Sequence, residues 1–357
     1  MVYLDANATE PLRPEARAAV IEALDLVGNP SSVHGPGRAA RRLLETSRET
    51  IATRFGADRE RIVFTSGGTE ADALAVAALG AGRRVIIGAT EHDAIRAAAP
   101  GADILPVDRD GIADLDRLAA LLAEGRPALV CLMLANNETG TIQPIAAAAA
   151  LCRRHGALLH VDAVPAAGRI AVDLAALGAD SLALSAHKLG GTKGAGALLL
   201  ADDRHIAPLI AGGGQERGRR GGTPALPAIA GFAAACRAAP SDLLPFRQAV
   251  ETAALAAGAI RLGGADRLPN TVCLALPGIR ADTQVIALDL AGIAVSAGAA
   301  CSSGKVARSH VLDAMGAGAL AGQAIRVSLP WNVTPAEIAA FTEAYAAMAA
   351  RLNRQAA

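Results

Sequence analysis

Short apolar runs alternate with helix-like segments along residues 38–200 of the chain. Apolar and charged positions recur at a helical period over 38–55, 70–79 and the alanine-rich stretch 145–155. The strand-like runs lie at 61–65, 84–88, 129–134, 158–161, 181–185 and 196–200. Short apolar strands separated by helices predict a mainly parallel sheet that helices cover on both faces. In such sheets the chemistry gathers at the carboxyl ends of the strands.

The pattern changes after residue 240. Strand-like stretches at 271–276, 293–296 and 325–329 accompany a helix over 282–291, for which Asp282 is the expected N-cap, and a final helix over 335–351 capped by Thr334. We interpret this region as a smaller α+β domain. The expected fold class is therefore α/β, with a large domain over 15–240 and a small domain formed by 1–14 and 241–357.

The composition of the chain further narrows what its core is made of and which partners it can bind. Hydrophobic residues make up 52% of the 357 positions but aromatic residues only 2%, so the core has to be built from Ala, Leu, Val and Ile. Lys plus Arg equals Asp plus Glu at 34 each, so no global charge favours nucleic acid or an anionic membrane.

The five cysteines are widely spaced and form no C-x-x-C pair, which argues against a disulfide framework and against a zinc ribbon. We see no signal peptide and no apolar run long enough to span a bilayer, and we expect a cytoplasmic protein.

The most informative stretch is 185–194, Ser-Ala-His-Lys-Leu-Gly-Gly-Thr-Lys-Gly. It delivers Lys188 from an apolar strand into a turn that contains too much glycine for a helix interior. An amine held at a strand end suits a Schiff base with an aldehyde cofactor. A solvated loop lysine is the simpler reading of this turn by itself.

Three other strand ends carry candidate ligands. The turn at 65–70 (Thr-Ser-Gly-Gly-Thr-Glu) offers backbone N–H groups and hydroxyls to a phosphate at a helix N-terminus, or it is a plain N-capped turn. Asp162 ends a buried strand, where it either pairs with a protonated pyridine nitrogen or caps a turn. His92 follows a strand and either lies flat on an aromatic cofactor ring or is structural.

The C-terminal region holds two further candidates. Cys301 lies in a loop of small residues, beside Lys305 and several hydroxyls, where an exposed thiol can ionise and act as a nucleophile. The other four cysteines stand in apolar contexts and are expected in the core. Arg326 interrupts an apolar strand, which a carboxylate ligand or an exposed edge position would explain.

Taken together, these segments resemble the cysteine desulfurases of the NifS/IscS kind, within the class V aminotransferase family of fold-type I pyridoxal phosphate (PLP) enzymes. The resemblance covers nearly the whole chain and rests on the order and spacing of the segments 4–9, 29–34, 65–70, 136–140, 160–162, 185–194, 219–223, 296–305 and 325–329. It implies a PLP-dependent transferase fold and a homodimer that converts L-cysteine to L-alanine.

The resemblance also implies a role for each matching residue. Lys188 would be the Schiff-base lysine, Asp162 would bind the pyridine nitrogen, and His92 would stack on the ring. Gly68, Thr69, Ser185 and His187 would hold the phosphate, Thr223 would reach in from the second subunit, Asn137 would contact cofactor or substrate, Arg326 would bind the substrate carboxylate, and Cys301 would receive the sulfur. The persulfide on Cys301 would then pass to an acceptor protein, such as an iron–sulfur scaffold, a nitrogenase-specific assembly protein or a tRNA-thiolation relay.

Two departures from the family pattern stand out. Pro165 occupies the position of a glutamine that usually donates a hydrogen bond to the phenolic oxygen of the cofactor, and the stretch 241–262 is shorter than usual. Two rival hypotheses therefore stay open. One is a selenocysteine lyase or another lyase or aminotransferase of the same fold, and the other is a paralogue that binds partners or cofactor without turnover.

Overall fold

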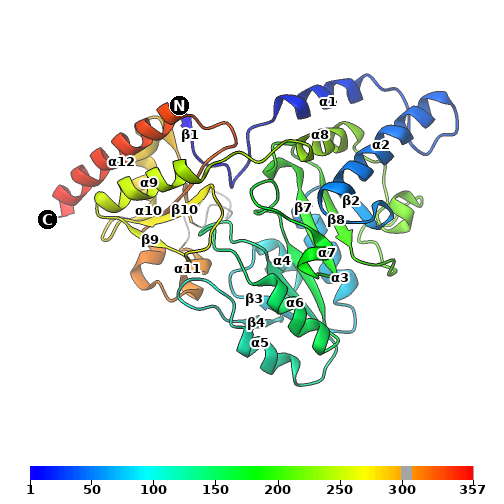
Figure 1. Cartoon of the computed structure of the whole chain (residues 1–357), viewed down its shortest axis with the longest axis horizontal. Coiled ribbons are helices and arrows are strands. Elements are labelled where there is room, and N and C mark those ends of the chain that lie inside the picture. Colours follow the sequence, from blue (N-terminus) through cyan, green and yellow to red (C-terminus); the bar gives the residue numbers. More distant parts are fainter. Residues whose placement is uncertain (299–307, 357) are drawn as a thin grey trace.

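A computed structural model describes residues 1–298 and 308–356 of the chain. Its largest element is a seven-stranded sheet with the strand order β2-β8-β7-β6-β5-β3-β4 (Figure 1). The strands are β2 (Ile62–Thr65), β3 (Arg84–Gly88), β4 (Asp103–Leu105), β5 (Ala128–Met133), β6 (Leu158–Asp162), β7 (Ser181–Ser185) and β8 (Gly196–Leu200). All neighbours pair in parallel except β8, which runs antiparallel to both β2 and β7. The predicted mainly parallel sheet is confirmed, with β4 as a strand that the apolar pattern did not reveal.

Helices cover both faces of this sheet, as predicted. Along β5, the side chains of Leu129 and Cys131 belong to a core cluster with helices α3 (Gly68–Leu79) and α4 (Asp93–Ala98). Val130 and Leu132 point to the other face, where they join a cluster with α2 (Gly35–Arg54), α5 (Leu115–Leu122), α6 (Ile145–Arg154) and α8 (Leu226–Cys236). This alternation follows from the two-residue period of a strand.

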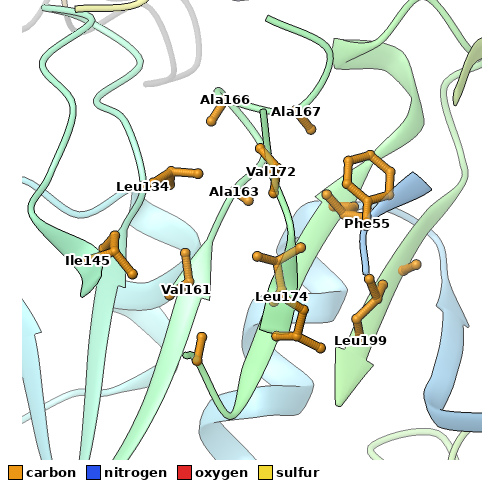
Figure 2. Packing of buried hydrophobic residues seen from close by; sticks show 14 of the residues in the cluster. Phe55, Leu134, Ile145, Val161, Ala163, Ala166, Ala167, Val172, Leu174 and Leu199 are labelled. Atoms are coloured by element: carbon orange, nitrogen blue, oxygen red, sulfur yellow. The ribbon is translucent and has the colours of Figure 1, made fainter. Parts of the chain in front are cut away.

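The core is built from small and branched side chains. Figure 2 shows part of it, where Leu134, Ile145 and Val161 lie on one side and Phe55, Leu174 and Leu199 on the other, with alanines between them. The remaining helices that accompany the large sheet are α1 (Pro14–Leu24) and the short α7 (Leu174–Leu177).

The C-terminal region forms a second, antiparallel sheet of order β12-β13-β10-β9. Its strands are β9 (Ile260–Leu262), β10 (Thr271–Ala275), β12 (Ser296–Ala297) and β13 (Ala324–Ser328), and β1 (Val2–Tyr3) pairs separately with β11 (Ile293–Ala294). Helices α9 (Leu244–Ala256), α10 (Ala281–Leu290) and α12 (Pro335–Ala356) contribute to its core, with α11 (His310–Ala314) beside it (Figure 1). The division into domains at residues 14 and 240 stays a prediction.

Two local expectations were wrong in this region. The run 293–296 is not one strand but parts of β11 and β12, which belong to different sheets. The N-cap of α10 is Arg280 rather than Asp282, which lies in the first turn and forms an ion pair with Arg280 at 2.5 Å. A carboxylate in that turn still interacts favourably with the helix dipole.

The cap expected at Thr334 is confirmed, because the Glu337 N–H donates to Thr334 Oγ1 while Glu337 Oε2 accepts from the Thr334 N–H at 2.8 Å. Within 1–298 and 308–356, no helix has the length and apolarity needed to cross a bilayer.

Candidate active site

A cavity of about 200 Å³ lies where the carboxyl ends of the parallel strands meet. It brings together most of the residues singled out from the sequence. The predicted site residues that line it are Gly68, Thr69, His92, Asn137, Asp162, Ser185, His187 and Lys188, and Pro165 lies in the same wall.

Lys188 enters this cavity from the end of β7. A single 3-10 turn, Ala186–Lys188, follows the strand, and Gly190 then takes a left-handed conformation with φ of 86°. Glycine adopts this conformation without strain, which explains why a glycine stands two residues after Lys188. Lys188 Nζ donates hydrogen bonds to the carbonyl oxygens of Asn7 and, at 3.0 Å, of Ala8. The N-terminal loop thus holds the amine at the mouth of the cavity.

The carboxyl groups of Asp162 and Asp72 form another part of the cavity wall. Burial, with the nearby Asp72 carboxyl, raises the pKa of Asp162 to about 7, and burial raises the pKa of Asp72 to about 8. The Val164 N–H donates to Asp162 Oδ1 at 2.8 Å. His160, two residues earlier on β6, contacts Asp72 Oδ1 at 3.0 Å and Ser181 Oγ at 2.8 Å, and burial lowers its pKa to about 4. A cation placed beside Asp162 would favour its ionised form.

The turn before α3 forms another wall. A Cβ added to Gly68 would lie 2.7 Å from Val164 Cγ2, so a side chain at this position would collide with the cavity wall. The N-terminus of α3 presents unpaired N–H groups and a positive dipole end, which together favour an anion. Burial and the neighbouring Lys188 lower the pKa of His187 to about 4, and its Nδ1 lies 3.2 Å from Thr9 Oγ1.

His92 is held at the N-cap of α4. Its Nδ1 accepts a hydrogen bond from the Ala94 N–H at 3.1 Å, so the ring proton of the neutral histidine is on Nε2. This contact fixes the ring where it lines the cavity.

Two predicted residues do not line this cavity. Arg326 is buried on the interior strand β13, so an exposed edge position is excluded. Its guanidinium donates to Asp5 Oδ1 at 2.7 Å and to the Asn137 carbonyl oxygen at 3.3 Å, which places it behind Asn137. Thr223 is exposed and lines a different cavity of about 220 Å³ beside Ser66. Cys301 lies outside the described residues.

The other four cysteines are buried free thiols, as expected. Burial raises the pKa of each one, so none of these four is suited to be an ionised nucleophile at neutral pH.

Three polar or charged residues of the cavity were not predicted from the sequence: Asn7, Asp72 and Arg169. Asn7 donates from Nδ2 to the Asn137 carbonyl and to Thr271 Oγ1, both at 2.9 Å. Asp72 lies three residues after Thr69 and therefore on the same face of α3, a spacing that could have revealed it. Arg169 donates to the Pro165 carbonyl at 2.6 Å and pairs with Glu10, a contact between distant segments that no local pattern predicts.

Comparisons with known proteins identify the family of this chain. Residues 2–341 match the family model described as aminotransferase class-V. A cysteine desulfurase from Cereibacter sphaeroides is 44% identical over 359 residues, which cover 94% of this chain and 92% of that protein. A NifS-like protein from Rickettsia africae has a TM-score of 0.89 at 35% identity, over 98% of this chain and 99% of that one. The structure of SspA in complex with cysteine has a TM-score of 0.82 at 28% identity, over 94% and 100% of the two chains.

The fold is that of an α/β enzyme of the class-V aminotransferase type. The family model spans nearly all of the chain, and the cysteine desulfurase relative covers almost the same length. The chain belongs to the cysteine desulfurases of the class-V aminotransferase family. Enzymes of this family work with PLP.

Proposed function

We propose that this protein is a PLP-dependent cysteine desulfurase that converts L-cysteine to L-alanine and leaves the sulfur as a persulfide on Cys301. The observation that carries the proposal is the presence of Lys188 and Asp162 in one cavity, in a chain of this family. The acceptor of the sulfur would be an iron–sulfur assembly protein or another thiolation partner.

The residues of the cavity fit the proposed cofactor. Asp162 is a buried carboxyl whose ionisation needs a cation, and a protonated pyridine nitrogen supplies one. Gly68 and Thr69 at the start of α3, with Ser185 and His187, would hold the phosphate. His92 would stack on the ring, and Asn137 would contact the cofactor or the substrate. When bound, PLP supplies an electron sink for the carbanion that forms at the substrate Cα.

Lys188 would serve first as the attachment point and then as the base. Its amine would hold the cofactor before the substrate binds and would then be free to accept the proton from the substrate Cα. The carbonyl oxygens of Asn7 and Ala8 accept hydrogen bonds from this amine and stabilise it when it carries a proton. Arg326, whose guanidinium donates to the carbonyl oxygen of the cavity residue Asn137 at 3.3 Å, would bind the substrate carboxylate.

Cys301 would carry out the sulfur transfer. Its thiolate attacks the sulfur of the substrate, so that an S–S bond forms as the Cβ–S bond of the substrate breaks. The electron pair of the broken bond would remain on Cβ, which takes up one proton, and Cα would take back the proton held by Lys188, to give alanine. The products are L-alanine and a persulfide, and no external oxidant or reductant is consumed.

We further propose that the enzyme is a homodimer in the cytoplasm and that Thr223 completes the phosphate site of the partner copy. Thr223 is exposed and lies outside the cavity of its own chain, which supports a role toward a second copy. The buried free thiols, together with a thiol nucleophile, suit a reducing compartment.

The test measures alanine and persulfide together. The protein loaded with PLP is incubated with L-cysteine, alanine is quantified, and the persulfide is alkylated and located by mass spectrometry. We expect one persulfide on Cys301, and no alanine from the Lys188→Ala variant. Cys301→Ala should abolish sulfur release, while Cys152→Ala, which changes a buried thiol on α6, should behave like the unchanged protein.

Full sulfur release by Cys301→Ala would refute the proposal. A strong preference for selenocysteine over cysteine in alanine formation would identify a selenocysteine lyase instead. PLP binding without alanine formation would identify a paralogue without turnover.

A further inference from the structure

The segment 210–222 between β8 and α8 folds back on itself into a compact loop, named here the 210–222 loop. The Gly221 N–H donates to the Ile210 carbonyl at 2.7 Å, and a Cβ added to Gly212 would lie 2.7 Å from the Gly221 Cα. Only glycines allow the two backbones to come this close. The side chain of Gln215 closes the loop by accepting from the Gly222 N–H at 3.2 Å.

The 210–222 loop contains strained backbone. Among the described residues, Glu216 and Arg217 are the non-glycine residues with positive φ, at 47° and 56°. Two consecutive residues in the left-handed region cost free energy and persist only where surrounding contacts fix them. Strained backbone of this kind clusters at functional positions, which suggests a function for the conformation at residues 216–217.

Glu216 provides the first anchor. Its carboxylate forms a two-bond pair with the Arg48 guanidinium on α2, both bonds at 2.8 Å, and accepts from the Phe64 N–H at 2.9 Å. The side chains of both charged partners are almost fully buried. Arg48 also donates to the Ile62 carbonyl at 3.0 Å and lies over the Phe64 ring. The loop is therefore fixed to α2 and to the open edge of β2.

Arg220 provides the second anchor, at the site itself. It donates to both carboxylate oxygens of Glu70, at 2.8 and 3.3 Å, and Glu70 Oε2 accepts from the Ser66 N–H at 2.7 Å. Glu70 is in the first turn of α3, directly after Gly68 and Thr69. The loop is thus tied to the same turn that forms the phosphate end of the cavity.

The residue that follows this anchored loop is Thr223, which is exposed. It lines the cavity beside Ser66 together with Glu216 and Arg220. Two ion pairs and strained backbone thus hold the loop, while the residue that follows it, Thr223, stays exposed.

We propose that Arg48 and Glu216 are positioning residues that hold Thr223 in place for the phosphate end of the cavity in a second copy of this chain. The proposal rests on the homodimer proposed above. On this proposal, the strained backbone at 216–217 serves the site of the partner copy rather than the cavity of its own chain.

The test uses mixed dimers that contain one intact Lys188. Sodium borohydride reduces the Schiff base between PLP and a lysine amine to a stable bond. Counting the labelled Lys188 peptide by mass spectrometry against PLP concentration therefore reports the affinity of that one site. In the first dimer, one subunit carries Glu216→Gln and the other carries Lys188→Ala. In the second dimer, both changes are on one subunit and the partner is unchanged.

The two dimers should differ, because the intact Lys188 receives an intact loop in the first and an altered loop in the second. We expect unchanged PLP affinity in the first dimer and about tenfold weaker affinity in the second, as for loss of one charge in a buried pair. Thr223→Ala in place of Glu216→Gln should give the same difference without disturbing any buried pair. Arg217→Gly, which relieves strain and leaves the Glu216 contacts, should retain unchanged affinity.

Equal affinity in the two dimers, with either variant, would overturn the positioning role. Weakening only in the first dimer would show that the loop serves its own subunit and would overturn it as well. A monomer in analytical ultracentrifugation would refute the proposed dimer, and absence of PLP labelling in the unchanged protein would refute the proposed function, so the three failures are distinguishable.

Discussion

The buried Asp162 carboxyl should make the PLP-free protein less stable as the pH rises. Its pKa is raised from 3.8 to about 7, first by burial and then by the nearby Asp72. Between these two values the unfolded chain loses the proton while the folded chain retains it. Stability is therefore highest below the ordinary pKa of aspartate and decreases as the pH rises toward about 7.

The magnitude follows from the size of the shift. One pKa unit corresponds to about 1.4 kcal/mol, so the rise at Asp162 corresponds to about 4 kcal/mol of lost stability above pH 7. Asp162→Asn has nearly the same shape and carries no ionisable group. We expect this variant to be similar in stability to the unchanged protein near pH 4 and more stable by up to about 4 kcal/mol near pH 8.

The assay is urea unfolding of the PLP-free proteins, followed by circular dichroism from pH 4 to 8.5. Asp162→Asn should also lose PLP affinity, because the ring nitrogen loses its anionic partner. Glu91→Gln is the matched control, since burial raises the pKa of Glu91 but its side chain does not line the cavity. It should gain stability at high pH and keep PLP binding. A stability difference between Asp162→Asn and the unchanged protein that stays constant with pH would refute this reasoning.

Three other predictions concern single contacts. Asp5→Ala leaves the buried Arg326 without its 2.7 Å ion-pair partner, so urea unfolding should show a loss of about 3 kcal/mol, and a loss below 0.5 kcal/mol would contradict the pairing. Pro165→Gln adds a side-chain donor in the cavity wall, and equilibrium dialysis should show PLP bound about fivefold more tightly, whereas unchanged affinity would mean that no donor is needed there. Phe341→Ala empties a fully buried site in the C-terminal core and should cost about 3–5 kcal/mol in urea unfolding, with a smaller loss indicating that the core collapses around the gap.

The sequence alone determined the large sheet and the chemistry at its edge. Apolar strands such as β5 and β6 are buried on both faces, so their composition is a local signal that needs no knowledge of the fold. Asp162 is the last residue of β6, and Lys188 and His92 lie within a few residues of the ends of β7 and β3. Parallel strands bring their carboxyl ends to one edge of the sheet. These residues could therefore be predicted together.

Only the tertiary structure decided the contacts between distant segments. Asn7 and Ser328 are 321 residues apart in the sequence, and so are Asp5 and Arg326. The hydrogen bonds within these two pairs join segments near the two ends of the chain. The two short strands at 293–297 separate into different sheets because each pairs with a different distant strand. In the sequence Glu216 is an ordinary loop glutamate, and only the structure shows its ion pair with the buried Arg48. Local sequence patterns indicate which side chains are buried. Which distant residues contact each other depends on how the whole chain packs.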